Sequence, residues 1–524
     1  LLSDVASFAS SLGFSAAAGD SSGFNDSDFR RAGPIKTKLT SLSPPTKNPP
    51  AKKFDGKRPK RSVGVGNRER VIRSKTEPDR IGPVEEPDDD RFKNLPDLPL
   101  VKHGSLGVWH RDATELEEKI IGKDKSIEYS RIEEWKSFVE TKKEFGQRLL
   151  AQYVRDYWSS RGQHNDIKML VSSLKSGTAA DKVSAMSVLI GDNPLANLRS
   201  IDSLSGMVTS KIGKRHAFAA FQSLQEIFLI LLPDRKLKAL YQRPLNHLPE
   251  NKEGYSLLLF WYWEESLKDR YERFVSALEE ASVDTVTDLK NLSLKTTYVL
   301  LKNKSEQERR LLSLLVNKLG DPENKVASNA DYHLTNLLSE HPNMKAVVID
   351  EVDNFLFRPH LGPQAKYHAV NFLSQIRLSH KGDGPKVAKR LVDIYFALFK
   401  VLVSEASLSP SVEKNDKRRR ETSNETHSNA KGASPSEMDS RLLSSILTGV
   451  NRAFPYLHSD EADDVVQAQT PLLFQMVHSK NFNVGVQALM LLDKISSKNQ
   501  IVSDRFYRAL YSKLVLPSAM ISSK

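Results

Sequence analysis

An apolar pattern with helical spacing runs along most of the chain, and it constrains the fold more than any other feature. Apolar residues fall three and four positions apart, as in the stripe Leu311, Leu312, Leu315, Val316 and Leu319. This spacing puts them on one face of an α-helix. No stretch shows the sustained alternation that marks strands between hairpin turns. The pattern therefore predicts an all-α protein from about residue 99 onward.

The helical stretches also resemble one another at a nearly constant distance. Pro322 and Pro363 open two of them about 40 positions apart, a period typical of HEAT and armadillo repeats with two helices per unit. An Ala-x-x-x-Leu pattern recurs in the stretches, starting at Ala185, Ala220, Ala330, Ala369 and Ala488. A small residue four positions before a large one lets two helices pack closely. We predict a HEAT/armadillo-like helical-repeat solenoid; an irregular helical bundle is the alternative.

Composition divides the chain into four parts. Residues 1–98 are rich in Pro and charged residues, basic first and acidic at the end. Such a segment buries too little apolar surface to offset the cost of ordering its backbone, so we predict a disordered tail. Helical repeats are predicted over 99–404 and again over 440–524. The segment 405–439 is of low complexity and lies between them, which predicts a disordered insertion loop.

The net charge is concentrated in the tail. The chain has 77 Lys and Arg against 65 Asp and Glu, a formal charge of +12, and residues 36–75 supply nearly all of this excess. The cluster fits a nuclear-import signal or a contact with RNA or DNA phosphates; a solvated tail without a partner is the third interpretation. Few aromatic residues are interleaved, so any nucleic-acid contact is expected to ignore sequence. The candidates are Lys52, Lys53, Lys57, Arg58, Lys60 and Arg61.

A second basic cluster lies in the predicted insertion loop. It is a run of four cations followed by Ser, Thr, Asn and Gly. It is interpreted either as another import signal or as part of a solvated loop. Its residues are Lys417, Arg418, Arg419 and Arg420.

The sequence contains no recognisable catalytic or metal-binding motif. The chain has no cysteine, which excludes disulfides, thiolate zinc sites and cysteine nucleophiles. It contains no G-x-x-x-x-G-K-[ST] and no H-E-x-x-H motif. His333 and His341 are interpreted as helix-packing residues, because a zinc site requires three or four converging ligands. We predict a protein that is not an enzyme, with no catalytic residues, metal, cofactor, small-molecule substrate or membrane span.

Six sequence segments in the second half of the chain point to a particular family. They lie in order at 341–345, 355–359, 367–376, 447–456, 482–492 and 503–511. Together they resemble the CCAAT-binding-factor family of nucleolar-complex proteins, most closely its largest member in a plant version. The resemblance covers about 306–514, with a weaker likeness back to residue 100. The chain starts with Leu1, and members of the family continue with more helices, so we expect a fragment.

The resemblance implies a non-enzymatic scaffold of ribosome biogenesis in the nucleus and nucleolus. It implies roles in large-subunit assembly, rRNA processing and pre-ribosome export. The implied partners are a second nucleolar-complex protein, in a heterodimer, and large-subunit precursor particles with their pre-rRNA. The family's name suggests an alternative, a CCAAT-box transcription regulator, although no groove-reading motif supports it. An importin-type adaptor shares the solenoid, but the Trp and Asn ladders that it needs are not evident.

Overall fold

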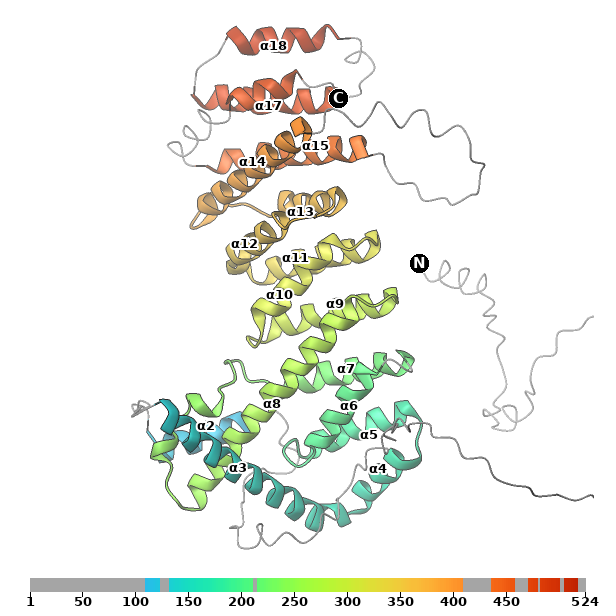
Figure 1. Cartoon of the computed structure of the whole chain (residues 1–524), viewed down its shortest axis with the longest axis vertical. Helices are drawn as coiled ribbons and strands as arrows, with labels where there is room; N and C mark the ends of the chain where they lie inside the picture. The colour runs from blue at the N-terminus through green and yellow to red at the C-terminus, as the bar shows by residue number, and fades with distance from the viewer. Residues whose placement is uncertain are drawn as a thin grey trace, which may run out of the picture. The chain divides into compact units, whose positions relative to one another are not determined.

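The computed structural model describes residues 109–122, 132–210, 214–408, 435–457, 470–478, 481–499 and 504–516. All belong to one unit, Glu77–Lys524. Its regular elements within these ranges are α- and 3-10 helices, and no strand occurs among them. The all-α prediction is confirmed (Figure 1). The predicted tail at 1–98 lies outside the described residues.

The first described helices run from Trp109 to Asn303. They are α2 (Trp109–Ile120), α3 (Ile132–Ser160), α4 (Asn165–Ser176), α5 (Ala179–Asp192), α6 (Leu198–Thr209), α7 (Lys214–Leu231), α8 (Lys252–Ser282) and α9 (Thr287–Asn303). An irregular segment with two short 3-10 helices, η3 (Leu240–Gln242) and η4 (Leu245–His247), joins α7 to α8.

The remaining helices alternate between two rows. They are α10 (Glu308–Asn317), α11 (Asn324–Glu340), α12 (Lys345–Leu356), α13 (Pro363–Gln375), α14 (Gly384–Leu408), α15 (Pro435–Ala453), α17 (Phe482–Asn499) and α18 (Asp504–Leu514). A further helix spans 470–477. One row is α9, α11, α13, α15 and α17, each in contact with the next, and the other is α10, α12 and α14 (Figure 1). Two helices per layer, stacked in chain order, confirm the helical-repeat prediction.

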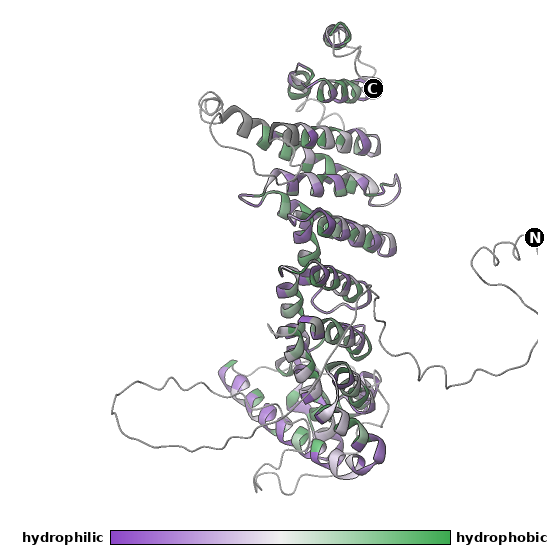
Figure 2. Ribbon diagram, turned by 90° about the vertical axis from the view of Figure 1, so that its right-hand side faces the viewer, coloured by the Kyte–Doolittle hydropathy of each residue, from purple (hydrophilic) through white to green (hydrophobic). Residues whose placement is uncertain are grey.

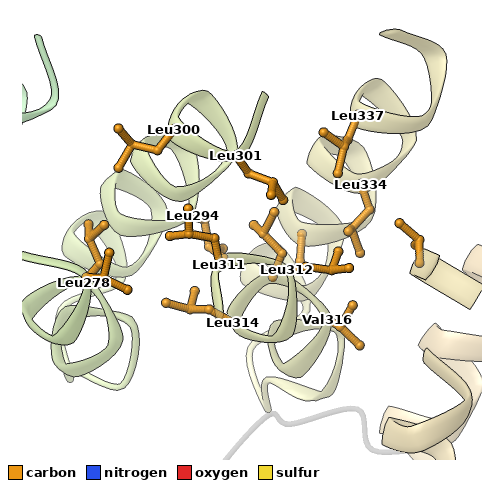
Figure 3. Packing of buried hydrophobic residues seen from close by; sticks show 14 of the residues in the cluster. Leu278, Leu294, Leu300, Leu301, Leu311, Leu312, Leu314, Val316, Leu334 and Leu337 are labelled. Carbon is orange, nitrogen blue, oxygen red and sulfur yellow. The ribbon is translucent and has the colours of Figure 1, made fainter. Parts of the chain in front are cut away.

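The predicted apolar stripes form the layer between the rows. Leu311, Leu312 and Leu315 are buried, and Figure 3 shows Leu311 and Leu312 of α10 meeting side chains of α9 and α11. Figure 2 shows hydrophobic residues where helices meet and hydrophilic ones on outward sides. The alanines and leucines of the repeated Ala-x-x-x-Leu pattern are all buried. These small residues therefore lie where neighbouring helices approach, as predicted.

The helix starts follow the sequence signals with one difference. Pro363 is the first residue of α13, where its missing N–H costs nothing. Pro322 instead precedes α11 by two positions, because the carboxylate of Asp321 accepts a hydrogen bond from the Glu323 N–H (3.0 Å) and forms a turn first. The helices beside the predicted insertion loop reach Leu408 and begin at Pro435, so they include the outer ends of the 405–439 segment.

The aromatic run in α8 packs inside the molecule. Phe260, Trp261 and Trp263 are buried. The rings of Trp109 and Trp263 meet edge to face with centroids 4.6 Å apart, and the Trp109 indole N–H donates to the carbonyl oxygen of Leu231 (2.8 Å). This cluster attaches α2 to the end of α7 and to the middle of α8.

Candidate docking surface

The ten basic residues singled out in the sequence lie outside the described residues. This holds for the tail cluster between Lys52 and Arg61 and for the loop cluster Lys417–Arg420. Their roles in import or RNA contact therefore stay predictions. The described residues offer a different candidate site, a polar surface along the row of helices α9, α11, α13, α15 and α17.

Polar side chains join α9 to α11 and α11 to α13. The Asn329 amide donates to the side-chain oxygen of Asn291, 38 positions earlier (2.7 Å). The Gln364 amide donates to the side-chain oxygen of Asn324, 40 positions earlier (2.6 Å). These separations reproduce the sequence period, because residues at equivalent positions of consecutive repeats lie side by side.

The same arrangement recurs between α15 and α17. The Ser444 hydroxyl donates to Gln487 Oε1 (2.9 Å), and the Gln487 amide donates to the Thr448 hydroxyl (3.2 Å). The Asn451 amide donates to the backbone carbonyl of Gln487 (3.2 Å). We call these side chains together the polar ladder: Asn291, Asn324, Asn329, Gln364, Ser444, Thr448, Asn451 and Gln487.

Exposed apolar residues lie one turn beyond two residues of the polar ladder. Tyr332 follows Asn329 by three positions and is 61% exposed, and Met490 follows Gln487 by three and is 55% exposed. Residues three apart lie on the same face of a helix. Amide and hydroxyl groups beside exposed Tyr and Met give a surface suited to another protein, since aromatic residues and Met are enriched in protein interfaces.

The two histidines considered as metal ligands have separate structural roles. The His333 ring stacks on Tyr298 with centroids 5.0 Å apart, and burial, with the nearby charge of Lys295, lowers the pKa of His333. His341 lies within hydrogen-bond distance of the Lys302 carbonyl oxygen (3.0 Å). Nowhere in the described ranges do three or more His, Asp or Glu residues gather as metal ligands would.

Sequence reasoning did not find a buried ionic cluster at the irregular segment between α7 and α8. Glu264 has no exposed surface and accepts two hydrogen bonds from Arg235 (2.5 and 3.1 Å) and one from the backbone N–H of Lys238 (2.9 Å). Arg243, 2% exposed, also donates to it. Burial raises the pKa of Glu264, but the hydrogen bond from Arg235 and the charges of Arg243 and Arg235 outweigh burial and hold this pKa below its usual value.

Arg243 extends this cluster to α2 and to the aromatic core. Its second nitrogen donates to Glu117 (2.7 Å), and its guanidinium lies 5.3 Å from the ring centroid of Trp261. The cluster thus fixes the segment that carries η3 and η4 against α8. We interpret it as structural, because its charges are paired within the fold.

None of the helices in the described ranges combines the length and apolar character that crossing a membrane requires. Within those ranges, the arrangement of two helix rows, a packed interior and a polar outer surface defines a HEAT- or armadillo-type helical-repeat protein.

Comparison with known proteins identifies the family. The chain is 57% identical to Protein SLOW WALKER 2 of Arabidopsis thaliana, over 100% of this chain and 52% of that protein. It is 38% identical to human CCAAT/enhancer-binding protein zeta, over 68% of this chain and 31% of that protein. It is 34% identical to Ribosome biogenesis protein NOC1 of Chaetomium thermophilum, over 73% of this chain and 38% of that protein. The chain belongs to the CCAAT-binding-factor family of nucleolar-complex proteins, as its sequence segments predicted, and spans about half or less of these relatives.

Other comparisons add little. No protein-family model matches the chain. Among solved structures, it is similar to a designed armadillo repeat protein, with 11% identity over 56% of this chain and 99% of that chain and a TM-score of 0.24. It is also similar to yeast importin-beta, with 12% identity over 78% of this chain and 54% of that chain and a TM-score of 0.25. Likenesses of this size carry no argument, and the helical-repeat assignment rests on the helix contacts above.

Proposed function

We propose that this chain is the helical-repeat part of a nucleolar scaffold that takes part in ribosome biogenesis without catalysing a reaction. The observation that carries the proposal is its similarity, over 73% of its length, to a relative named for ribosome biogenesis. A relative of Drosophila melanogaster, 31% identical over 67% of the chain, is named Nucleolar complex protein 1. Stacked repeats support this role because they present long surfaces that bind other macromolecules.

The finer steps follow from the family resemblance. We propose a heterodimer with a second nucleolar-complex protein, which docks on the polar ladder and the exposed Tyr332 and Met490. The complex would bind large-subunit precursor particles and their pre-rRNA during assembly, rRNA processing and export. The basic residues between Lys52 and Arg61, in the predicted disordered tail at 1–98, would direct nuclear import or neutralise RNA phosphates.

Affinity purification of the tagged 524-residue chain from cells tests the scaffold role. We expect large-subunit precursor rRNA and one nucleolar-complex protein in stoichiometric amount. Replacing Tyr332 and Met490 by Glu should lower recovery of that protein about tenfold, the loss typical of interface anchors. Met169→Glu with Val188→Glu is the matched control, because these residues are equally exposed on α4 and α5. Recovery of neither rRNA nor partner from the unchanged chain contradicts the proposal.

Import has a separate test. Replacing Lys52, Lys53, Lys57, Arg58, Lys60 and Arg61 by Ala should shift a fluorescent fusion from the nucleus to the cytoplasm. Replacing Lys417–Arg420 in the same way tests the second cluster. Unchanged uptake in both variants removes the import interpretation of these residues.

The name of the human relative favours one alternative, a regulator that binds CCAAT boxes. This function requires the chain to distinguish a CCAAT duplex from scrambled DNA at physiological salt, by a factor of roughly 1,000 or more for a specific reader. Equal affinity for both duplexes excludes it. The scaffold proposal expects this equality.

A further inference from the structure

A cleft of about 490 Å³ lies between α12 and α14 and the loop that leads into α14. Its aliphatic lining includes Ala346 and Ile349 of α12, Leu378 of the loop and Val387 of α14. The two helices contact one another in the row α10, α12 and α14 (Figure 1). The cleft is therefore part of the repeat surface on the row opposite the polar ladder.

Positive charge is in excess around this cleft. Five cations line it against two carboxylates: Lys345, Arg377, Lys381, Lys386 and Arg390 against Asp350 and Asp383. Arg390 pairs with Asp350 (3.1 Å) and Lys386 with Asp383 (3.3 Å). Within the described part of the chain, Lys345, Arg377 and Lys381 have no carboxylate partner. A ligand with carboxylates or phosphates would complement these three.

The loop that carries two of these cations is held in place from both sides. The Lys345 ammonium donates to the Arg377 carbonyl oxygen (2.9 Å). The His380 ring stacks on Tyr456 with centroids 4.3 Å apart. The Arg452 guanidinium donates to the Ser374 carbonyl oxygen (2.7 Å), just before the loop. Because these contacts already order the loop, a ligand that binds there has a smaller entropy cost of ordering it.

The side chains that line the cleft favour an acidic peptide over a nucleic acid as its ligand. Proteins that bind single-stranded nucleic acid stack its bases on aromatic side chains, and none of the described residues that line the cleft is aromatic. Aliphatic side chains between unpaired cations instead match a peptide that carries carboxylates around an aliphatic residue. We propose that this cleft binds a short acidic segment of a partner protein, with an aliphatic side chain against Leu378 and carboxylates near Lys345, Arg377 and Lys381.

This inference rests on the proposed scaffold function and adds a second docking site to it. A peptide array tests it with the full chain as the soluble binder. The array combines Asp or Glu with Leu or Ile at varied spacing, and sister peptides replace either the acids by Lys or the aliphatic residues by Ser. Fluorescence anisotropy then measures the affinity of the best binder. We expect both replacements to abolish binding.

Charge reversal locates the site. Lys345→Glu with Lys381→Glu should weaken the best peptide about tenfold or more, since each unpaired cation contributes to a partly desolvated contact. Lys325→Glu with Lys400→Glu is the control, because both lysines are exposed elsewhere and the net charge changes equally. Circular dichroism melts check that both variants fold.

Three results overturn the proposal: no peptide binds, both variants lose affinity equally, or a uridine oligonucleotide responds to the cleft variant while the peptide does not. The last result makes the cleft an RNA site. A cleft variant that loses the peptide but still recovers precursor rRNA supports the cleft as a separate site. Failure of the peptide test with normal rRNA recovery overturns only the cleft, and the scaffold function stands.

Discussion

Glu264 shows how one residue stabilises an irregular part of this fold. Its buried carboxylate faces Arg235 and Arg243 and also fixes the backbone at Lys238. Removing Glu264 takes away the carboxylate that Arg235 and the buried Arg243 share and leaves Arg243 with Glu117 alone; breaking a buried ion pair in this way costs about 3–5 kcal/mol. Glu264 is therefore a main anchor of the segment between α7 and α8, beside Glu117, which accepts from Arg243, and Glu306, which accepts from the Leu237 N–H.

Replacing Glu264 by Gln should lower the free energy of unfolding by about 3–5 kcal/mol, measured by urea unfolding. Glu133→Gln is the control, because Glu133 is exposed on α3, and surface changes of this kind stay within about 0.5 kcal/mol. Equal effects of the two substitutions would show that the cluster is not a stabilising element.

The depressed pKa of Glu264 predicts a pH dependence. A carboxyl whose pKa is lower folded than unfolded stabilises the fold above the unfolded value, near 4.5, and the stabilisation is lost as the pH falls through the folded value. The difference in unfolding free energy between the original chain and Glu264→Gln should therefore shrink on acidification below about pH 4.5. Urea unfolding at several pH values measures it; a difference that grows at low pH contradicts this assignment.

Among the elements, α14 and α15 approach so closely that a glycine is required. A Cβ on Gly449 of α15 would lie 2.5 Å from the Tyr395 ring of α14, and Tyr395 is buried. Gly206 of α6 has open space around it. In a helix, Ala is more favourable than Gly by about 1 kcal/mol. Contact with the neighbouring helix therefore decides whether a Gly→Ala substitution raises or lowers the free energy of unfolding.

Gly449→Ala should destabilise the chain by about 1–3 kcal/mol through overpacking, whereas Gly206→Ala should stabilise it by about 0.5–1 kcal/mol. Thermal or urea unfolding of the two variants gives the comparison. Stabilisation by both substitutions would mean that α14 and α15 are not packed as described.

Sequence reasoning predicted the elements better than the contacts between loops. The stripe around Leu311 and the alanines at 330 and 369 are read from local spacing, because helices bury one face at a fixed period. The Glu264 cluster joins residues from α2, α8 and an irregular segment, so no local pattern indicates it. The cleft was not predicted from the sequence for the same reason. Lys345 and Lys381 belong to different repeats, and each alone resembles an ordinary surface lysine.

At the scale of the whole described molecule, the central feature is the stacking of equivalent helices at a period of about 40 residues. The polar ladder records this stacking directly, since its hydrogen bonds join residues 38, 40 and 43 positions apart. Both proposed docking sites depend on it. The partner surface needs consecutive repeats side by side, and the cleft needs α12 beside α14.

Thiol crosslinking tests this stacking most directly, because the chain has no cysteine of its own. Asn291→Cys with Asn329→Cys places two thiols on adjacent helices of the row, and a short bismaleimide should join them within one chain at high yield. Asn291→Cys with Gln487→Cys places them several repeats apart and should remain uncrosslinked. Efficient crosslinking of the first pair alone is the predicted result; failure of the first pair, or equal yields for both, would contradict the repeat architecture.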